Sequence, residues 1–123
     1  GLELTNNEYN YGRGIGKADN YCLYGGWLIA FEIVYGQSHP STNVLKSWMF
    51  LDQELHERLF LVQILVPNPK KSISPNRINL CDFIASKIKT EHSKRFVYSR
   101  FTLDESKDVW LPELQERLKA IRS

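Results

Sequence analysis

Cysteine is scarce in this chain: there are two among 123 residues, Cys22 and Cys81, and they form no Cys-x-x-Cys motif. Two thiols in apolar surroundings are typical of reduced, buried cysteines in a cytoplasmic protein, and zinc binding is not expected. No apolar stretch approaches the roughly 20 residues that a membrane helix requires. The first eight residues lack the basic start and the apolar middle of a signal peptide. These absences predict a cytoplasmic protein without membrane association.

What the chain does contain is ordinary for a soluble globular protein, with 42% hydrophobic and 24% charged residues. Its length predicts a single domain, 1–123, in which residues 1–17 form an irregular lead-in that truncation of a longer element would explain. The periodicity predicts strands at 21–24, 27–35, 59–66 and 95–103, and helices at 42–57, 78–92 and 109–121. A hairpin followed by helical crossovers predicts an α/β fold, a mixed central sheet of about four strands flanked by helices.

One carboxylate interrupts an apolar run. Glu32 lies within the strand 27–35, which is rich in β-branched and aromatic residues and is therefore expected to be buried on both faces. An ionised Glu there costs several kcal/mol unless a partner compensates it. Asp19 precedes the first strand, and Gly25-Gly26 predicts the hairpin turn that would bring the two acids together. Mg²⁺ and Mn²⁺ prefer paired carboxylates as ligands. In an open alternative, Asp19 caps a turn and Glu32 forms an ion pair with Lys17 or Arg13.

A polar ridge follows the strand that carries Glu32. His39, Asn43 and Lys46 recur at i, i+4 and i+7, the spacing that places residues on one face of a helix. A lysine there could reach back to the carboxylates and stabilise the charge that builds on a phosphate in a transition state. His39 and Asn43 could donate to phosphate oxygens, although His39 beside Pro40 is equally compatible with a simple helix start.

The pattern of these residues resembles the PD-(D/E)XK nuclease superfamily, which has a restriction-endonuclease-like core. The matching residues are Asp19 in Gly-Lys-Ala-Asp and, after a gap of 12 residues, Glu32-Ile33-Val34. The helix, strand and helix that are expected next agree with the core of that family over about residues 17–103. Two departures stand out: no proline precedes Asp19, and Val34 occupies the place of the motif lysine.

The resemblance implies a metal-dependent nuclease that cleaves DNA. Asp19, Glu32 and the backbone carbonyl of Val34 would hold Mg²⁺ or Mn²⁺, and Lys46 would replace the missing lysine from the neighbouring helix, as happens in some members. An acid from an N-terminal helix often completes the site, and here only Glu3 or Glu8 could do so. DNA is preferred to RNA because the resembled family acts mostly on DNA.

The net charge of +2 hides a basic region. Residues 67–100 hold eight Lys and Arg against two acids, so this stretch is +6 while the rest of the chain is −4. Lys70 and Lys71, with Arg77 beyond them, could bind phosphates at one wall of a cleft. The other basic residues of the region are equally compatible with a solvated surface, and the lone Gln63 of its strand could face the site or a neighbouring edge.

Two other interpretations remain open. A nuclease-like domain without catalysis could serve as a nucleic-acid or protein-binding module, and the replacement at Val34 favours it. An unrelated α/β interaction domain could pair Glu32 with an internal Arg. A homodimer, or a place in a larger protein, is compatible with either.

Overall fold

The computed structural model describes residues 7–35, 39–66, 73–102 and 107–122. A short two-stranded sheet comes first, made of β1 (Tyr9–Gly12) and β2 (Gly16–Ala18). The main sheet has the order β3-β4-β5-β6, with bounds Asn20–Tyr24, Trp27–Tyr35, Leu59–Val66 and Phe96–Thr102. The helices are α1 (Pro40–Gln53), α2 (Pro75–Glu91) and α3 (Lys107–Arg122).

The main sheet is mixed, as the sequence predicted. β3 and β4 form an antiparallel hairpin around Gly25 and Gly26, both of which have positive φ. β4, β5 and β6 run parallel, and α1 and α2 provide the crossovers between them. The α/β fold class is therefore confirmed, and from Asn20 onward the elements follow the predicted order of strand, strand, helix, strand, helix, strand and helix. Apolar, β-branched strands buried on both faces require such a cover on each side of the sheet.

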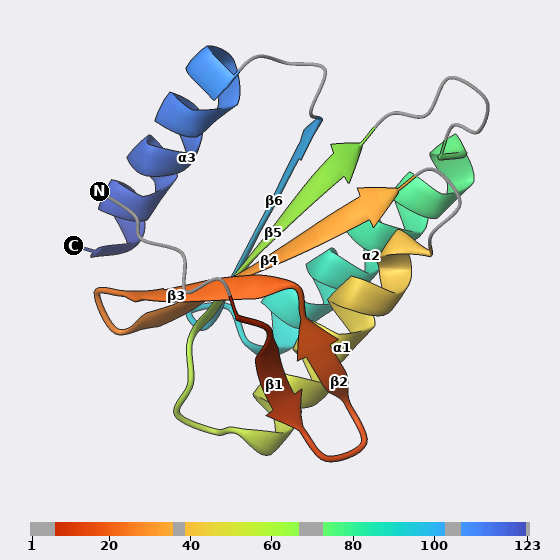
Figure 1. The fold of residues 1–123 in the computed structure, drawn as a ribbon. Coiled ribbons are helices and arrows are strands. Elements are labelled where there is room, and N and C mark those ends of the chain that lie inside the picture. The colour runs from red at the N-terminus through yellow and green to blue at the C-terminus, as the bar shows by residue number, and fades with distance from the viewer. Residues whose placement is uncertain (1–6, 36–38, 67–72, 103–106, 123) are drawn as a thin grey trace.

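The helices cover both faces of the sheet (Figure 1). One core lies between the sheet and the two helices α1 and α2, where Leu28, Leu61, Phe96, Leu51 and Ile88 are among its members. A second core lies between the other face and α3, whose Leu114 and Leu118 pack on residues such as Phe60 and Val62. Alternate residues along β4 and β5 therefore enter different cores, which is the period-two rule for strands.

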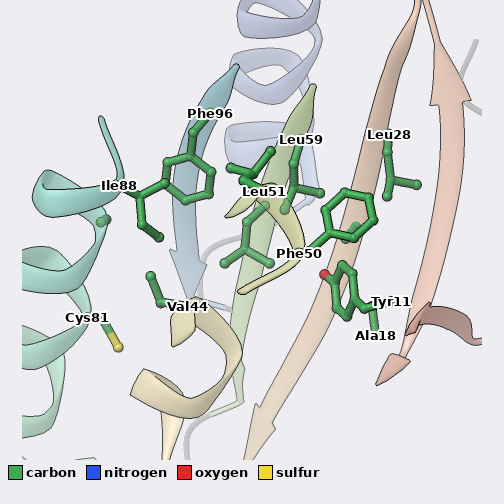
Figure 2. Close-up of a cluster of buried hydrophobic side chains, with 13 residues drawn as sticks. Tyr11, Ala18, Leu28, Val44, Phe50, Leu51, Leu59, Cys81, Ile88 and Phe96 are labelled. Carbon is green, nitrogen blue, oxygen red and sulfur yellow. The ribbon is translucent and has the colours of Figure 1, made fainter. Parts of the chain in front are cut away.

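The irregular lead-in expected for residues 1–17 was wrong for residues 9–12 and 16–17, which belong to strands. They form the β1–β2 hairpin, in which Tyr9 pairs with Ala18 and Asn10 with Lys17. Tyr11 and Ala18 are buried in the same core as Phe50 of α1, and Figure 2 shows these side chains grouped together. Strands of four and three residues separated by glycines give too short an alternation for period-two analysis.

Helix boundaries differ slightly from those predicted. α1 begins at Pro40 rather than Thr42, because proline is preorganised for the first position of a helix. α2 begins at Pro75, where the Ser74 hydroxyl accepts a hydrogen bond from the Arg77 backbone N–H and caps the helix. Within the described residues, no helix is long and apolar enough to cross a membrane.

Candidate active site

Asp19 and Glu32 meet just before β3 begins. The β3–β4 ladder begins with Asn20 opposite Phe31, so the next step would place Asp19 opposite Glu32. There the backbone N–H groups donate to side-chain carboxylates instead of to backbone carbonyls. The Asp19 N–H donates to Glu32 Oε1 at 2.9 Å, and the Ile33 N–H donates to Asp19 Oδ2 at 2.7 Å. The hairpin therefore brings the two acids together, as the sequence predicted.

Lys46 completes the group. Its Nζ lies 2.7 Å from Glu32 Oε2 and donates to the Lys17 carbonyl at 2.6 Å. Lys46 lies on α1, which contacts β5 and β1, and a Cβ at Gly16 of β2 would lie 3.4 Å from Lys46 Cδ, so the stem of Lys46 runs beside the hairpin. We refer to Asp19, Glu32 and Lys46 as the Glu32 site.

The Glu32 site joins a buried carboxylate to an exposed one. Glu32 is 2% exposed, whereas Asp19 faces solvent. Burial raises the pKa of Glu32, while the Lys46 ammonium group and the Asp19 backbone N–H oppose that rise. The pairing supplies what the sequence required, a cation that compensates a carboxylate inside an apolar strand. That cation is Lys46, which the sequence allowed to reach back to the carboxylates, rather than Lys17 or Arg13, the partners of the alternative interpretation.

Two further side chains surround the carboxylate. Tyr11 is 3% exposed, and burial raises its pKa, which nearby Glu32 raises further. Its hydroxyl faces Ser47 without hydrogen-bonding geometry to any described residue. The buried Ser47 donates to the Asn43 carbonyl at 3.2 Å. Sequence analysis missed Tyr11 because its segment was not predicted as a strand; its alternation with Tyr9 was the available signal.

The remaining predicted site residues differ in where they lie and in how exposed they are. Val34 continues β4 opposite Leu65 and is buried. His39 immediately precedes α1, is exposed, and makes no capping hydrogen bond with its side chain. Asn43 is half-buried one helical turn before Ser47. Arg77 lies in the first turn of α2. Lys70 and Lys71, as well as Glu3, lie outside the described residues, and Glu8 is exposed before β1.

Gln63 lies in the same row of the sheet as Glu32. In the parallel ladders Glu32 is opposite Gln63, and Gln63 is opposite Arg100. Gln63 is fully buried, donates to the Pro40 carbonyl at 2.8 Å and accepts from the Tyr98 hydroxyl. The start of α1 is thereby tied to the sheet, so Gln63 faces the side of the sheet on which the site lies.

A second group of polar residues could hold a metal ion. Asp52, Glu91 and His92 place one ligand atom each within 4.8 Å of one another, at the C-terminal ends of α1 and α2. We refer to these three residues as the His92 cluster. It is the one such group of three among the residues that the structure describes, and its two carboxylates are exposed.

Compared with known proteins, the chain matches no family model, no curated protein and no solved structure. The function therefore has to be inferred from the chemistry of the two groups just described.

Proposed function

We propose that this protein is a metal-dependent nuclease that hydrolyses phosphodiester bonds of DNA at the Glu32 site. The observation that supports this most is the convergence of Asp19, Glu32 and Lys46 from three separate elements onto one point. The resemblance to the PD-(D/E)XK superfamily depends on these same residues. A hairpin with the two acids, followed by helix, strand and helix, is also the order of elements that the resemblance requires.

The residues present suit a divalent cation. Glu32 Oε2 is paired with Lys46 Nζ at 2.7 Å and receives no other hydrogen bond from the described residues. Asp19 Oδ1 is also without a hydrogen bond from them, and Oδ2 is held by the Ile33 N–H. A pair of carboxylates at one point provides the hard oxygen ligands that Mg²⁺ or Mn²⁺ prefers. The Val34 carbonyl is proposed as a third ligand on the resemblance alone.

Each residue has a defined role in this proposal. A bound divalent ion would polarise a phosphoryl oxygen and lower the pKa of a water molecule. Asp19 and Glu32 hold the ion, and their hydrogen bonds from Asp19 and Ile33 N–H groups fix the direction of both carboxylates. Lys46 supplies a positive charge where negative charge develops on the phosphate. His39, Asn43, Lys70, Lys71 and Arg77 are proposed to contact the DNA backbone.

A second candidate is a nuclease-like domain that binds nucleic acid or protein without cleaving. The observation that favours it is the ion pair itself: Lys46 already neutralises Glu32, so a divalent ion has to compete with the ammonium group for Oε2. Val34 at the position of the motif lysine points the same way. We further propose that the protein acts in the cytoplasm, as a homodimer or as part of a larger protein.

Cleavage of labelled duplex DNA with Mn²⁺, and separately with EDTA, tests the proposal. We expect cleavage by the wild-type protein only with the metal, and its complete loss in Glu32→Gln. Glu91→Gln is the matched control, since it removes a carboxylate from the His92 cluster and is expected to cleave normally. Binding of DNA without any metal-dependent cleavage would establish the second candidate instead.

A further inference from the structure

The β1–β2 hairpin has two faces of opposite character. Its inner face is apolar: Tyr11 packs on Phe50 with ring centroids 5.3 Å apart, and Tyr9 contacts both Tyr11 and Phe50 edge to face. Ala18 is fully buried in the same core. Aromatic contacts of this kind fix the base of the hairpin on α1, so that its orientation is set by the core rather than by its own short ladder.

The outer face and the turn are polar and positively charged. Asn10 and Lys17 are paired across the two strands and are both exposed, and Arg13 is exposed in the turn. No acidic residue occurs between residues 9 and 18. The hairpin therefore presents two cations without an acid of its own to neutralise them.

The backbone at Gly12 and Gly14 is open to solvent, although Ile15 of the same turn packs against the first core. A Cβ added at Gly12 or Gly14 would meet no atom within 4 Å, and both residues have positive φ. Figure 1 shows this turn directed away from the main sheet. Backbone without side chains allows a flat or bulky partner to approach closely.

The same hairpin is joined directly to the Glu32 site. Lys46 Nζ donates to the Lys17 carbonyl at 2.6 Å, and Asp19 follows Ala18, the last residue of β2. Lys17 therefore lies two residues before Asp19 in the chain, and its backbone carbonyl is bonded to Lys46 of the site. Cations that flank a site for phosphate chemistry suit the neighbouring phosphates of the same strand.

We infer that the outer face of the β1–β2 hairpin is an arm that binds the DNA backbone next to the cleaved bond, with Arg13 and Lys17 on successive phosphates. This rests on the proposed function, because it takes the Glu32 site as the place of cleavage. A protein partner fits less well, since the exposed residues of this face include no aromatic or large aliphatic side chain for the centre of an interface.

The test is the salt dependence of binding to a short labelled DNA duplex, measured with EDTA so that no metal-dependent cleavage occurs. Each phosphate contact contributes about 0.9 to the slope of log affinity against log salt, so Arg13→Ala/Lys17→Ala should lower the slope by about 1.8. At about 0.15 M salt, loss of two such contacts should make the double variant bind DNA roughly 30-fold more weakly than the wild-type protein. Lys94→Ala/Lys119→Ala is the matched control: it removes the same charge from exposed positions and should leave slope and affinity nearly unchanged.

The outcomes separate this inference from the proposed function. If the wild-type protein binds DNA through the hairpin but never cleaves it, the proposed nuclease function is wrong and the proposed DNA-binding arm stands. Equal slopes for the two double variants, in a protein that cleaves, would overturn the arm and leave the nuclease. A wild-type protein that does not bind DNA would overturn both. Because Arg13 and Lys17 are exposed, unchanged thermal unfolding is expected for the variants, and circular dichroism checks it.

Discussion

The Glu32 site and the His92 cluster contain the same kinds of residue in opposite environments. Each has one Asp and one Glu with a nitrogen-bearing side chain beside them, Lys46 in the first and His92 in the second. Glu32 is 2% exposed and lies inside a strand, whereas the side chains of Asp52 and Glu91 are 56% and 52% exposed at helix ends. Burial makes the first group expensive to ionise without a partner, while solvent screens the second.

The hydrogen bonds of the His92 cluster already use its ligand atoms. The Arg95 guanidinium donates to His92 Nδ1 at 3.1 Å, which leaves the ring proton on Nε2, 2.7 Å from Asp52 Oδ1. A metal ion at Nε2 would need that proton on Nδ1, where it would face Arg95. The Trp48 indole N–H also donates to Glu91 at 2.6 Å. The comparison teaches that proximity of ligand types is by itself weak evidence for a metal site, since both groups already use most of their ligand atoms in hydrogen bonds and ion pairs.

Replacement of Lys46 by Ala should have the largest effect in this comparison. Loss of one charge directed at the transition state typically slows the chemical step by about 10²–10³. Cleavage of duplex DNA with Mn²⁺ measures the rate, and Lys94→Ala, which removes an exposed lysine beyond α2, is the control. An unchanged rate in Lys46→Ala would show that this lysine is only the structural partner of Glu32.

Metal binding at the Glu32 site, and not at the His92 cluster, should stabilise the folded protein. A ligand at about 100 times its Kd stabilises the folded protein by about 2.7 kcal/mol, which thermal unfolding with and without Mn²⁺ detects. We expect this shift to disappear in Glu32→Gln and to persist in Asp52→Asn/Glu91→Gln. The opposite pattern would move the metal to the His92 cluster.

Arg95→Ala should destabilise the protein without affecting cleavage. The guanidinium donates to the carbonyls of Leu51, Glu54 and Glu57, which closes the chain after α1. Hydrogen bonds to a charged group are each worth about 1.5–3 kcal/mol, and partial exposure reduces their sum, so we expect about 2 kcal/mol from urea unfolding. A large loss of cleavage at unchanged stability would contradict a structural role.

The smallest expected effect is in the pH dependence of stability. Because the pKa of Glu32 is raised in the folded protein, its protonated form favours folding, and this contribution is lost as pH rises from the ordinary glutamate range through the raised pKa. Urea unfolding should therefore show wild-type stability falling relative to Glu32→Gln over that interval. A difference between the two proteins that does not change with pH would mean that Lys46 compensates the burial completely.

Much of the fold could be predicted because each long element has an unambiguous period. β4 and β5 are continuous apolar runs, and both were predicted with the bounds that the structure has. The β1–β2 hairpin could not be predicted, because its strands are short and Tyr11 and Ala18 are held by Phe50, which lies far along the chain.

The sequence by itself determined that Glu32 needs a cation, since the cost of a charge in an apolar strand follows from residue types alone. It also brought Asp19 near Glu32, because a two-residue turn leaves a hairpin little choice of register. Only the tertiary structure decided that the cation is Lys46, that Gln63 lies in the row of Glu32, and that Arg95 occupies the His92 cluster. Those contacts join segments separated by crossovers, and the packing of whole helices on the sheet, rather than local spacing, sets their geometry.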